Sequence, residues 1–199
     1  MVGYNGRDSV VTVPSKVHYV SKGVFQMKTY IERVVFEGNI VYLGANAFGA
    51  CSHLERVEFK GRVESLDFNA FASCTRLKYI NLPKGLKKIG AQCFQMANGL
   101  KVVHIPEGVQ EIGEAAFAEC EGLTYVSIPS SVKKVGPRVF SGCKCSIDIN
   151  IKKPMFGLPE GFDKAFLDYF KGKVRWNHPA EDPVSRAVDE ALGGILNHR

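Results

Sequence analysis

Cysteines are the residues of this sequence best suited to chemistry, because thiols can bind zinc, form disulfides or act as nucleophiles. Four of the six recur at one position, three residues after a repeated phenylalanine: Cys51, Cys74, Cys120 and Cys143. Cys93 precedes another such phenylalanine, and Cys145 lacks a nearby His or third Cys to complete a zinc set with Cys143. A spacing set by a repeat favours small buried hydrophobic residues, so we expect no metal site, no redox role and no cofactor.

The histidines and glycines offer no catalytic motif either. The histidines occupy different positions of the repeat, at His18, His53, His104, His178 and His198. The sequence contains no Gly-rich phosphate loop and no Cys-x-x-Cys pair. We therefore expect a protein that is not an enzyme and has no catalytic residues.

An internal repeat of 23 residues positions these groups. Phenylalanine recurs without insertion or deletion at Phe25, Phe48, Phe71, Phe94, Phe117 and Phe140. Nine and eleven residues after each one stand apolar residues such as Val34 and Phe36, and this alternation predicts a strand. Several of these strands are followed by proline, which ends them. A second apolar pair, such as Ile40 and Leu43, forms another side of the coil and could be a short second strand.

Each repeat is also expected to contain a short helical turn that carries the phenylalanine. The position four residues earlier holds typical N-cap residues: Ser21, Gly44, Asp67, Gly90, Gly113 and Gly136. The Phe and Cys columns would share the inward face of this turn, because they are three residues apart. The predicted fold class is an α/β repeat solenoid of parallel strands and short helical turns, stacked around one continuous core.

The repeat resembles the leucine-rich repeats of the BspA-like class, whose pattern is Leu-x-x-Ile-x-Ile-Pro, then Val-x-x-Ile-Gly, then Ala-Phe-x-x-Cys. The match is clearest from Leu100 to Cys120 and from Leu123 to Cys143, and it covers residues 10 to about 152. At the position of the Asn ladder of the commoner leucine-rich repeats, only one of six repeats has Asn, at Asn39. The resemblance implies a leucine-rich-repeat solenoid, in a class that includes cell-surface adhesins.

The repeat pattern decays after residue 152, which divides the chain into four parts. Residues 1–152 form the solenoid, and residues 153–176, with several aromatic side chains, are expected to cap its open end. Residues 177–183 are a polar linker with two prolines. Residues 184–199 predict an amphipathic helix with an apolar stripe: Val184, Ala187, Val188, Ala191, Leu192, Ile195 and Leu196. This terminal helix either folds back on the cap, docks to a partner or self-associates.

Outward-facing strand residues are the best candidates for binding. Residues between the inward ones point away from the core, and they vary from repeat to repeat. The candidates are Arg33, Arg56, Glu58, Tyr79, Asn81, His104 and Tyr125. Arg and Tyr are enriched in interface hot spots, so we expect non-enzymatic recognition of a protein partner through this strand face. The alternatives are a solvated face without a ligand, and a structural or adhesive component of a larger assembly docked by the terminal helix.

Charge and hydropathy indicate which other kinds of partner the sequence favours or excludes. The net charge is +6, and residues 68–106 contain six Lys or Arg and no acid, which suits an acidic partner. Nucleic acid is not expected, because the basic residues lack interleaved aromatic platforms. The sequence has neither an apolar run long enough to span a membrane nor a secretory signal at its N-terminus. We expect a cytoplasmic protein as encoded, with a surface or assembly-associated location as the alternative.

Overall fold

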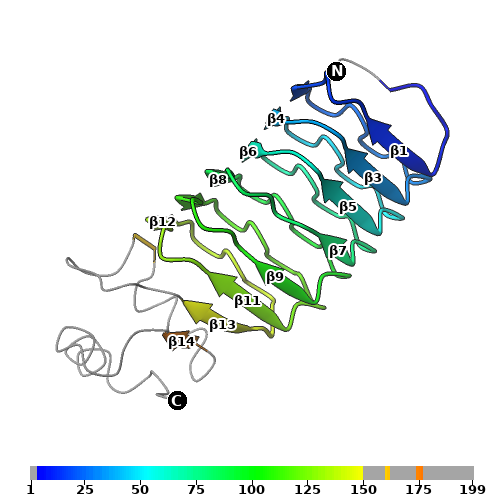
Figure 1. The fold of residues 1–199 in the computed structure, drawn as a ribbon. Coiled ribbons are helices and arrows are strands. Elements are labelled where there is room, and N and C mark those ends of the chain that lie inside the picture. Colours follow the sequence, from blue (N-terminus) through cyan, green and yellow to red (C-terminus); the bar gives the residue numbers. More distant parts are fainter. Residues whose placement is uncertain (1–3, 150–159, 162–173, 177–199) are drawn as a thin grey trace, which may run out of the picture.

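The computed structural model describes residues 4–149, 160–161 and 174–176, and its repeats stack one on another as the coils of a solenoid (Figure 1). Each coil of the solenoid has three sides: strands form two of them, and a turn forms the third. Among the described residues, all strand pairs are parallel. The paired residues of β1–β12 are 23 positions apart, as for Val34 and Val57, whereas β13 pairs with β11 at a spacing of 21, as for Val126 and Ile147. The parallel strand stack predicted from the repeat is confirmed.

The strands form three sheets. Sheet 1 contains β1 (Val10–Val13), β3 (Arg33–Phe36), β5 (Arg56–Phe59) and β7 (Tyr79–Ile80). Sheet 2 contains β9 (Val102–His104), β11 (Tyr125–Ile128), β13 (Ser146–Ile149) and β14 (Val174–Trp176). Sheet 3, on another side of the coils, contains β2 (Tyr19–Val20), β4 (Ile40–Leu43), β6 (Val63–Leu66), β8 (Lys88–Ile89), β10 (Glu111–Ile112) and β12 (Lys134–Val135).

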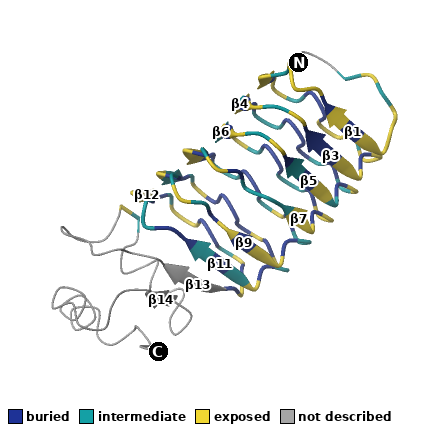
Figure 2. Ribbon diagram, viewed as in Figure 1, coloured by how far each residue is buried: buried dark blue, intermediate teal, exposed yellow. Residues whose placement is uncertain are grey.

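The phenylalanine column forms the centre of the core, as predicted. All six rings are at most 1% exposed, and neighbouring rings stack with centroids 4.6–5.5 Å apart and interplanar angles of 4–18°. Inward strand residues bury the rest of the interior, while the corners of the coils stay exposed (Figure 2). Because each ring packs on the rings of both neighbouring coils, the coils stabilise one another as a stack.

The predicted helical turns are wrong, because the described part of the chain contains no helix. Two residues flanking each buried Phe adopt positive φ, for example Asn46 (54°) and Ala50 (58°), and such residues interrupt an α-helix. The Phe48 amide donates to the Ala70 carbonyl of the next coil at 2.8 Å, whereas the Cys51 amide donates to Phe48 within its own turn at 3.1 Å. The turns therefore form a third hydrogen-bonded ladder between coils.

The cysteine column is buried, as predicted from its spacing. Cys51, Cys74, Cys120 and Cys143 each donate from Sγ to the carbonyl of the Phe one coil earlier, at 3.0–3.1 Å. Burial raises the pKa of Cys51 to about 11 and raises the pKa of Cys74 well above its ordinary value. All four thiols pack and hydrogen-bond in the core, and burial disfavours thiolate chemistry at Cys51 and Cys74.

The two ends of the stack are covered differently. At the N-terminal end, Tyr4 packs its ring on Phe25 with centroids 5.0 Å apart, which the sequence did not indicate. At the other end, β14 pairs with β13, and Glu160 pairs with Lys134 at the edge of sheet 3. The rest of the predicted cap, the linker 177–183 and the helix 184–199 lie outside the described residues. Within the described residues, no helix is long and apolar enough to cross a bilayer.

Candidate protein-binding surface

Three of the predicted binding residues stand side by side on the outer face of sheet 1. The register pairs Arg33 of β3 with Arg56 of β5, and Arg56 with Tyr79 of β7. Their side chains point outward because neighbouring residues, such as Val34 and Val57, point into the core. All three are exposed: the side chains of the two arginines by 47% and 52%, and Tyr79 by 46%.

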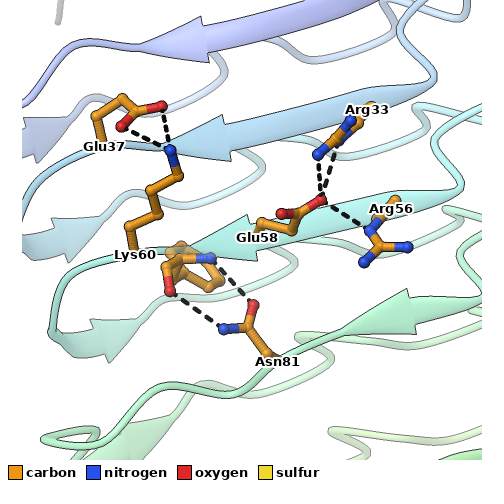
Figure 3. Close-up of polar contacts among 7 residues, drawn as sticks. Arg33, Glu37, Arg56, Glu58, Lys60 and Asn81 are labelled. Atoms are coloured by element: carbon orange, nitrogen blue, oxygen red, sulfur yellow. Dashed lines mark hydrogen bonds and ion pairs between the residues drawn. The ribbon is translucent and has the colours of Figure 1, made fainter.

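Glu58 joins the two arginines. Its Oε1 accepts hydrogen bonds from Arg33 Nε at 2.9 Å and from Arg56 Nε at 2.7 Å, and Arg33 Nη2 lies 2.8 Å away (Figure 3). Desolvation alone would raise the pKa of Glu58, but the hydrogen bonds and charges of Arg56 and Arg33 outweigh it and lower the pKa below its ordinary value. Glu58 is thus a carboxylate at neutral pH and holds both guanidinium groups in place.

Tyr79 supports Arg56 from another direction. The guanidinium carbon of Arg56 lies 4.6 Å from the centroid of the Tyr79 ring, which is a cation–π contact. The exposed ion pairs of Glu58 with the two arginines contribute only about 0.2–1 kcal/mol to stability. The main effect of these ion pairs and of the cation–π contact is to restrict the rotamers of the arginine side chains, so less entropy is lost when a partner binds. We call Arg33, Arg56, Glu58 and Tyr79 the arginine–tyrosine cluster.

The Asn81 side chain is bonded to the backbone of the preceding coil, where its amide replaces a rung of the backbone ladder. Its Nδ2 donates to the Phe59 carbonyl at 3.1 Å and its Oδ1 accepts from the Phe59 amide at 3.0 Å (Figure 3). In the two preceding coils, the amides of Glu37 and Lys60 donate to the equivalent carbonyls of Val13 and Phe36. Pro83 stands at that place in the next coil and has no N–H, so Asn81 supplies the donor.

Asn81→Ala is expected to lower the free energy of unfolding by about 1–2 kcal/mol, because the Phe59 carbonyl and amide lose their partner. Equilibrium urea denaturation followed by circular dichroism measures this. Thr12→Ala is the matched control, since Thr12 occupies the same repeat position in β1 and is exposed. Equal unfolding midpoints for the two variants would show that the Asn81 bonds carry no stability.

His104 and Tyr125 form a separate pair on sheet 2. Their ring centroids are 5.7 Å apart with an interplanar angle of 59°. They lie on β9 and β11, and the described residues include no strand pairing between β7 and β9 that would join them to the cluster on sheet 1. The structure thus brings the predicted residues together in two groups, with Asn81 bonded to the backbone. The helix candidates Val184, Val188, Ala191, Leu192, Ile195 and Leu196 lie outside the described residues.

Several charged residues near these groups are already paired. Lys60 Nζ lies 3.0 Å from Glu37 Oε1 (Figure 3), and Lys78 Nζ lies 3.0 Å from Glu55 Oε2. On sheet 3, Lys88 pairs with Glu111 and Lys134 with Glu160. In the part of the chain that the structure describes, no three His, Cys, Asp or Glu side chains gather as a metal site would require. The arrangement presents cations and aromatic rings for contact.

One family model matches the chain, and its description is BspA type leucine-rich repeat region. It matches in six copies over residues 18–146, which include β3, β5 and β7 of sheet 1 and the His104–Tyr125 pair. Among curated proteins none matches the chain.

Solved leucine-rich-repeat structures from bacteria are similar to this chain. A T. pallidum leucine-rich repeat protein is 25% identical over 98% of this chain and 88% of its own length, with a TM-score of 0.72. A Bacteroides ovatus leucine-rich repeat protein is 35% identical over 71% of this chain, with a TM-score of 0.64. A leucine-rich cell surface protein of Faecalibacterium prausnitzii shares the fold, at 24% identity over 76% of this chain and a TM-score of 0.57. The matches span 42% and 50% of the lengths of the last two proteins.

Proposed function

This chain belongs to the BspA-type leucine-rich-repeat family, and from that premise we propose that it is a non-enzymatic scaffold that recognises a protein partner through the outer face of sheets 1 and 2. Leucine-rich repeats are generally scaffolds for protein interaction or adhesion. The exposed strand residues vary along the stack of coils, while the buried residues maintain the fold. This separation lets the outer face carry the specificity.

The arginine–tyrosine cluster is the observation that supports this proposal most strongly. Arg and Tyr are among the residue types enriched in interface hot spots, and here both kinds are exposed on adjacent strands. Glu58 and Tyr79 fix Arg56 before any partner arrives. The Nε of Arg56 is used in this contact, and its two Nη groups extend beyond Glu58 (Figure 3), where a carboxylate or carbonyl of a partner could accept from them.

Simultaneous substitution of Arg33, Arg56, Tyr79 and Tyr125 by Ala is expected to abolish partner binding while the fold stays intact. The proteins retained by tagged wild-type protein from a lysate of the source cells would be compared with those retained by the variant. The control changes Tyr19 and Tyr42 of sheet 3 to Ala, together with Lys87 and Lys133, which immediately precede its strands β8 and β12. It therefore removes the same number of rings and charges from that side of the coils. Binding that survives in the first variant and disappears in the control would move the site to sheet 3.

The alternative function, a structural or adhesive component docked by residues 184–199, predicts a different result. Deletion of these residues would lower the oligomeric state or remove a partner while the solenoid stays folded. Unchanged mass by light scattering and an unchanged set of retained proteins would contradict the alternative. The strand-face variant and the deletion together assign each lost partner to one region.

A further inference from the structure

The strand side of the solenoid is interrupted between β7 and β9. Sheet 1 ends at β7 and sheet 2 begins at β9, although their coils are consecutive (Figure 1). Between other consecutive coils, the backbone amide of the residue just before a strand donates a hydrogen bond to a carbonyl of the preceding coil. Glu55 donates to Glu32, Lys78 to Glu55, and Thr124 to Lys101, at 2.8–2.9 Å. Among the described residues, neither Lys101 nor Val102 donates such a bond to the Lys78 carbonyl.

The same two coils remain joined on their other sides. Before β7, the Phe71 amide donates to the Cys93 carbonyl of the next coil at 2.8 Å. After β7, β8 pairs with β10 through Lys88 with Glu111 and Ile89 with Ile112. The coils are therefore held at the turn and at sheet 3, and the backbone groups of β7 and β9 that face each other form two local strand edges.

The core is also less well covered at this interruption. Ile80 and Leu82 occupy inward repeat positions but are only partly buried. Their equivalents in the neighbouring coils are almost completely buried, for example Val57 and Val103. Pro106 has no N–H to donate to the Leu82 carbonyl of the preceding coil. Strand edges without a pairing between them and partly exposed apolar side chains thus occur at one place.

The surroundings of the interruption are apolar and basic. Tyr79 on β7 is 46% exposed and Val102 on β9 is 49% exposed. Lys78 and Lys101 precede the two strands at the same repeat position, and both are exposed. Lys78 pairs with Glu55, whereas no ion pair of Lys101 is found among the described residues. Lys78 and Lys101 both lie beside the interruption, so the charge there favours an anionic ligand.

We propose that the interruption between β7 and β9 binds an extended, acidic peptide segment of the protein partner. The peptide backbone pairs with the free strand edges, as in β-strand addition, and reaches the amides of Lys101 and Val102. An apolar side chain covers Ile80 and Leu82, and flanking carboxylates lie beside Lys78 and Lys101. This inference rests on the proposed function and assigns a chemical class to the segment that is recognised.

Fluorescence anisotropy with labelled, end-capped peptides of about nine residues tests the proposal, since a strand of that length spans a sheet edge. The probes alternate Glu with Val, Gln with Val, or Lys with Val. Full-length protein is expected to bind the Glu–Val probe most tightly, and Lys78→Gln with Lys101→Gln is expected to weaken it about five- to tenfold. The matched control, Lys87→Gln with Lys133→Gln, removes two charges that immediately precede β8 and β12 of sheet 3, and it should bind as wild type does.

Hydrogen exchange then locates the bound probe. Slower exchange of the Lys101 and Val102 amides on addition of the Glu–Val peptide would support pairing at the interruption. Equal affinity for all three probes, or a loss of affinity only in the control, would overturn the inference. Failure of the peptides while the partner still depends on Arg33 and Arg56 would overturn it too, and would leave the proposed function standing.

Discussion

Phe94→Ala is expected to lower the free energy of unfolding by about 3–5 kcal/mol, the largest effect of any single substitution we consider. The Phe94 ring is fully buried between Phe71, at 5.4 Å, and Phe117, at 5.1 Å. Its removal leaves a cavity in the middle of the stack, and both neighbouring rings lose a packing face. The backbone ladders on either side resist the collapse that would fill this space.

Equilibrium urea denaturation followed by far-ultraviolet circular dichroism measures the effect. Val102→Ala is a suitable control, because it also truncates an apolar side chain in the strand region but at an exposed position. The control should change stability by no more than about 0.5 kcal/mol. An unchanged midpoint for Phe94→Ala would mean that the phenylalanine column does not hold the coils together.

Gly113→Ala is expected to destabilise the protein by about 1–3 kcal/mol through overpacking of the backbone. A Cβ atom at Gly113 would lie 2.4 Å from the Ala91 amide nitrogen and 2.7 Å from the Gly90 carbonyl carbon of the preceding coil. These are main-chain atoms, so they cannot rotate away as a side chain could. The two coils would have to separate, which would strain the bond from the Gly113 amide to the Ile89 carbonyl.

Gly49→Ala is the matched control for this prediction. An added Cβ there would meet the Asn46 side chain first, with Oδ1 at 3.2 Å. Its stability should change by less than about 1 kcal/mol, since loss of unfolded-state entropy offsets a mild contact. Thermal unfolding of both variants provides the comparison, and equal melting temperatures would contradict the close approach of the coils at Gly113.

The strands and the core could be predicted because the repeat is exact in length. The period of two around Val34 and Phe36 identifies which residues point inward, and the same reasoning places Arg33 and Tyr79 outside. The burial of Cys51 and its equivalents follows from their distance to the phenylalanine column. The features that all coils share, namely the strands, the inward residues and the Phe and Cys columns, could therefore be predicted from the sequence.

The turns were misread because local spacing does not distinguish a helical turn from a turn with left-handed residues. Asn46 favours positive φ, but Ala50, Met96 and Glu119 adopt it without any signal in their side chains. Hydrogen bonds to the next coil stabilise these conformations, and such bonds join residues about one repeat apart. The positive φ values of these residues are therefore stabilised by tertiary contacts between coils, which local sequence does not indicate.

Site details depend on single departures from the repeat. By its repeat position alone, Asn81 resembles an outward binding residue. Pro83, however, has no N–H to donate to the Phe59 carbonyl, and the Asn81 side chain supplies that donor. The interruption between β7 and β9 has no clear counterpart in the sequence, because β9 and β11 pair although Pro129 follows β11. Tyr4 lies before the first repeat, so the pattern contains no position for it.

The central claim, recognition through sheets 1 and 2, is tested most directly by a hydrogen-exchange footprint of the solenoid with its captured protein partner. We predict slower amide exchange on complex formation in β3, β5, β7, β9 and β11, and unchanged exchange in sheet 3. Protection confined to β2, β4, β6, β8, β10 and β12, with sheets 1 and 2 unaffected, would contradict the account.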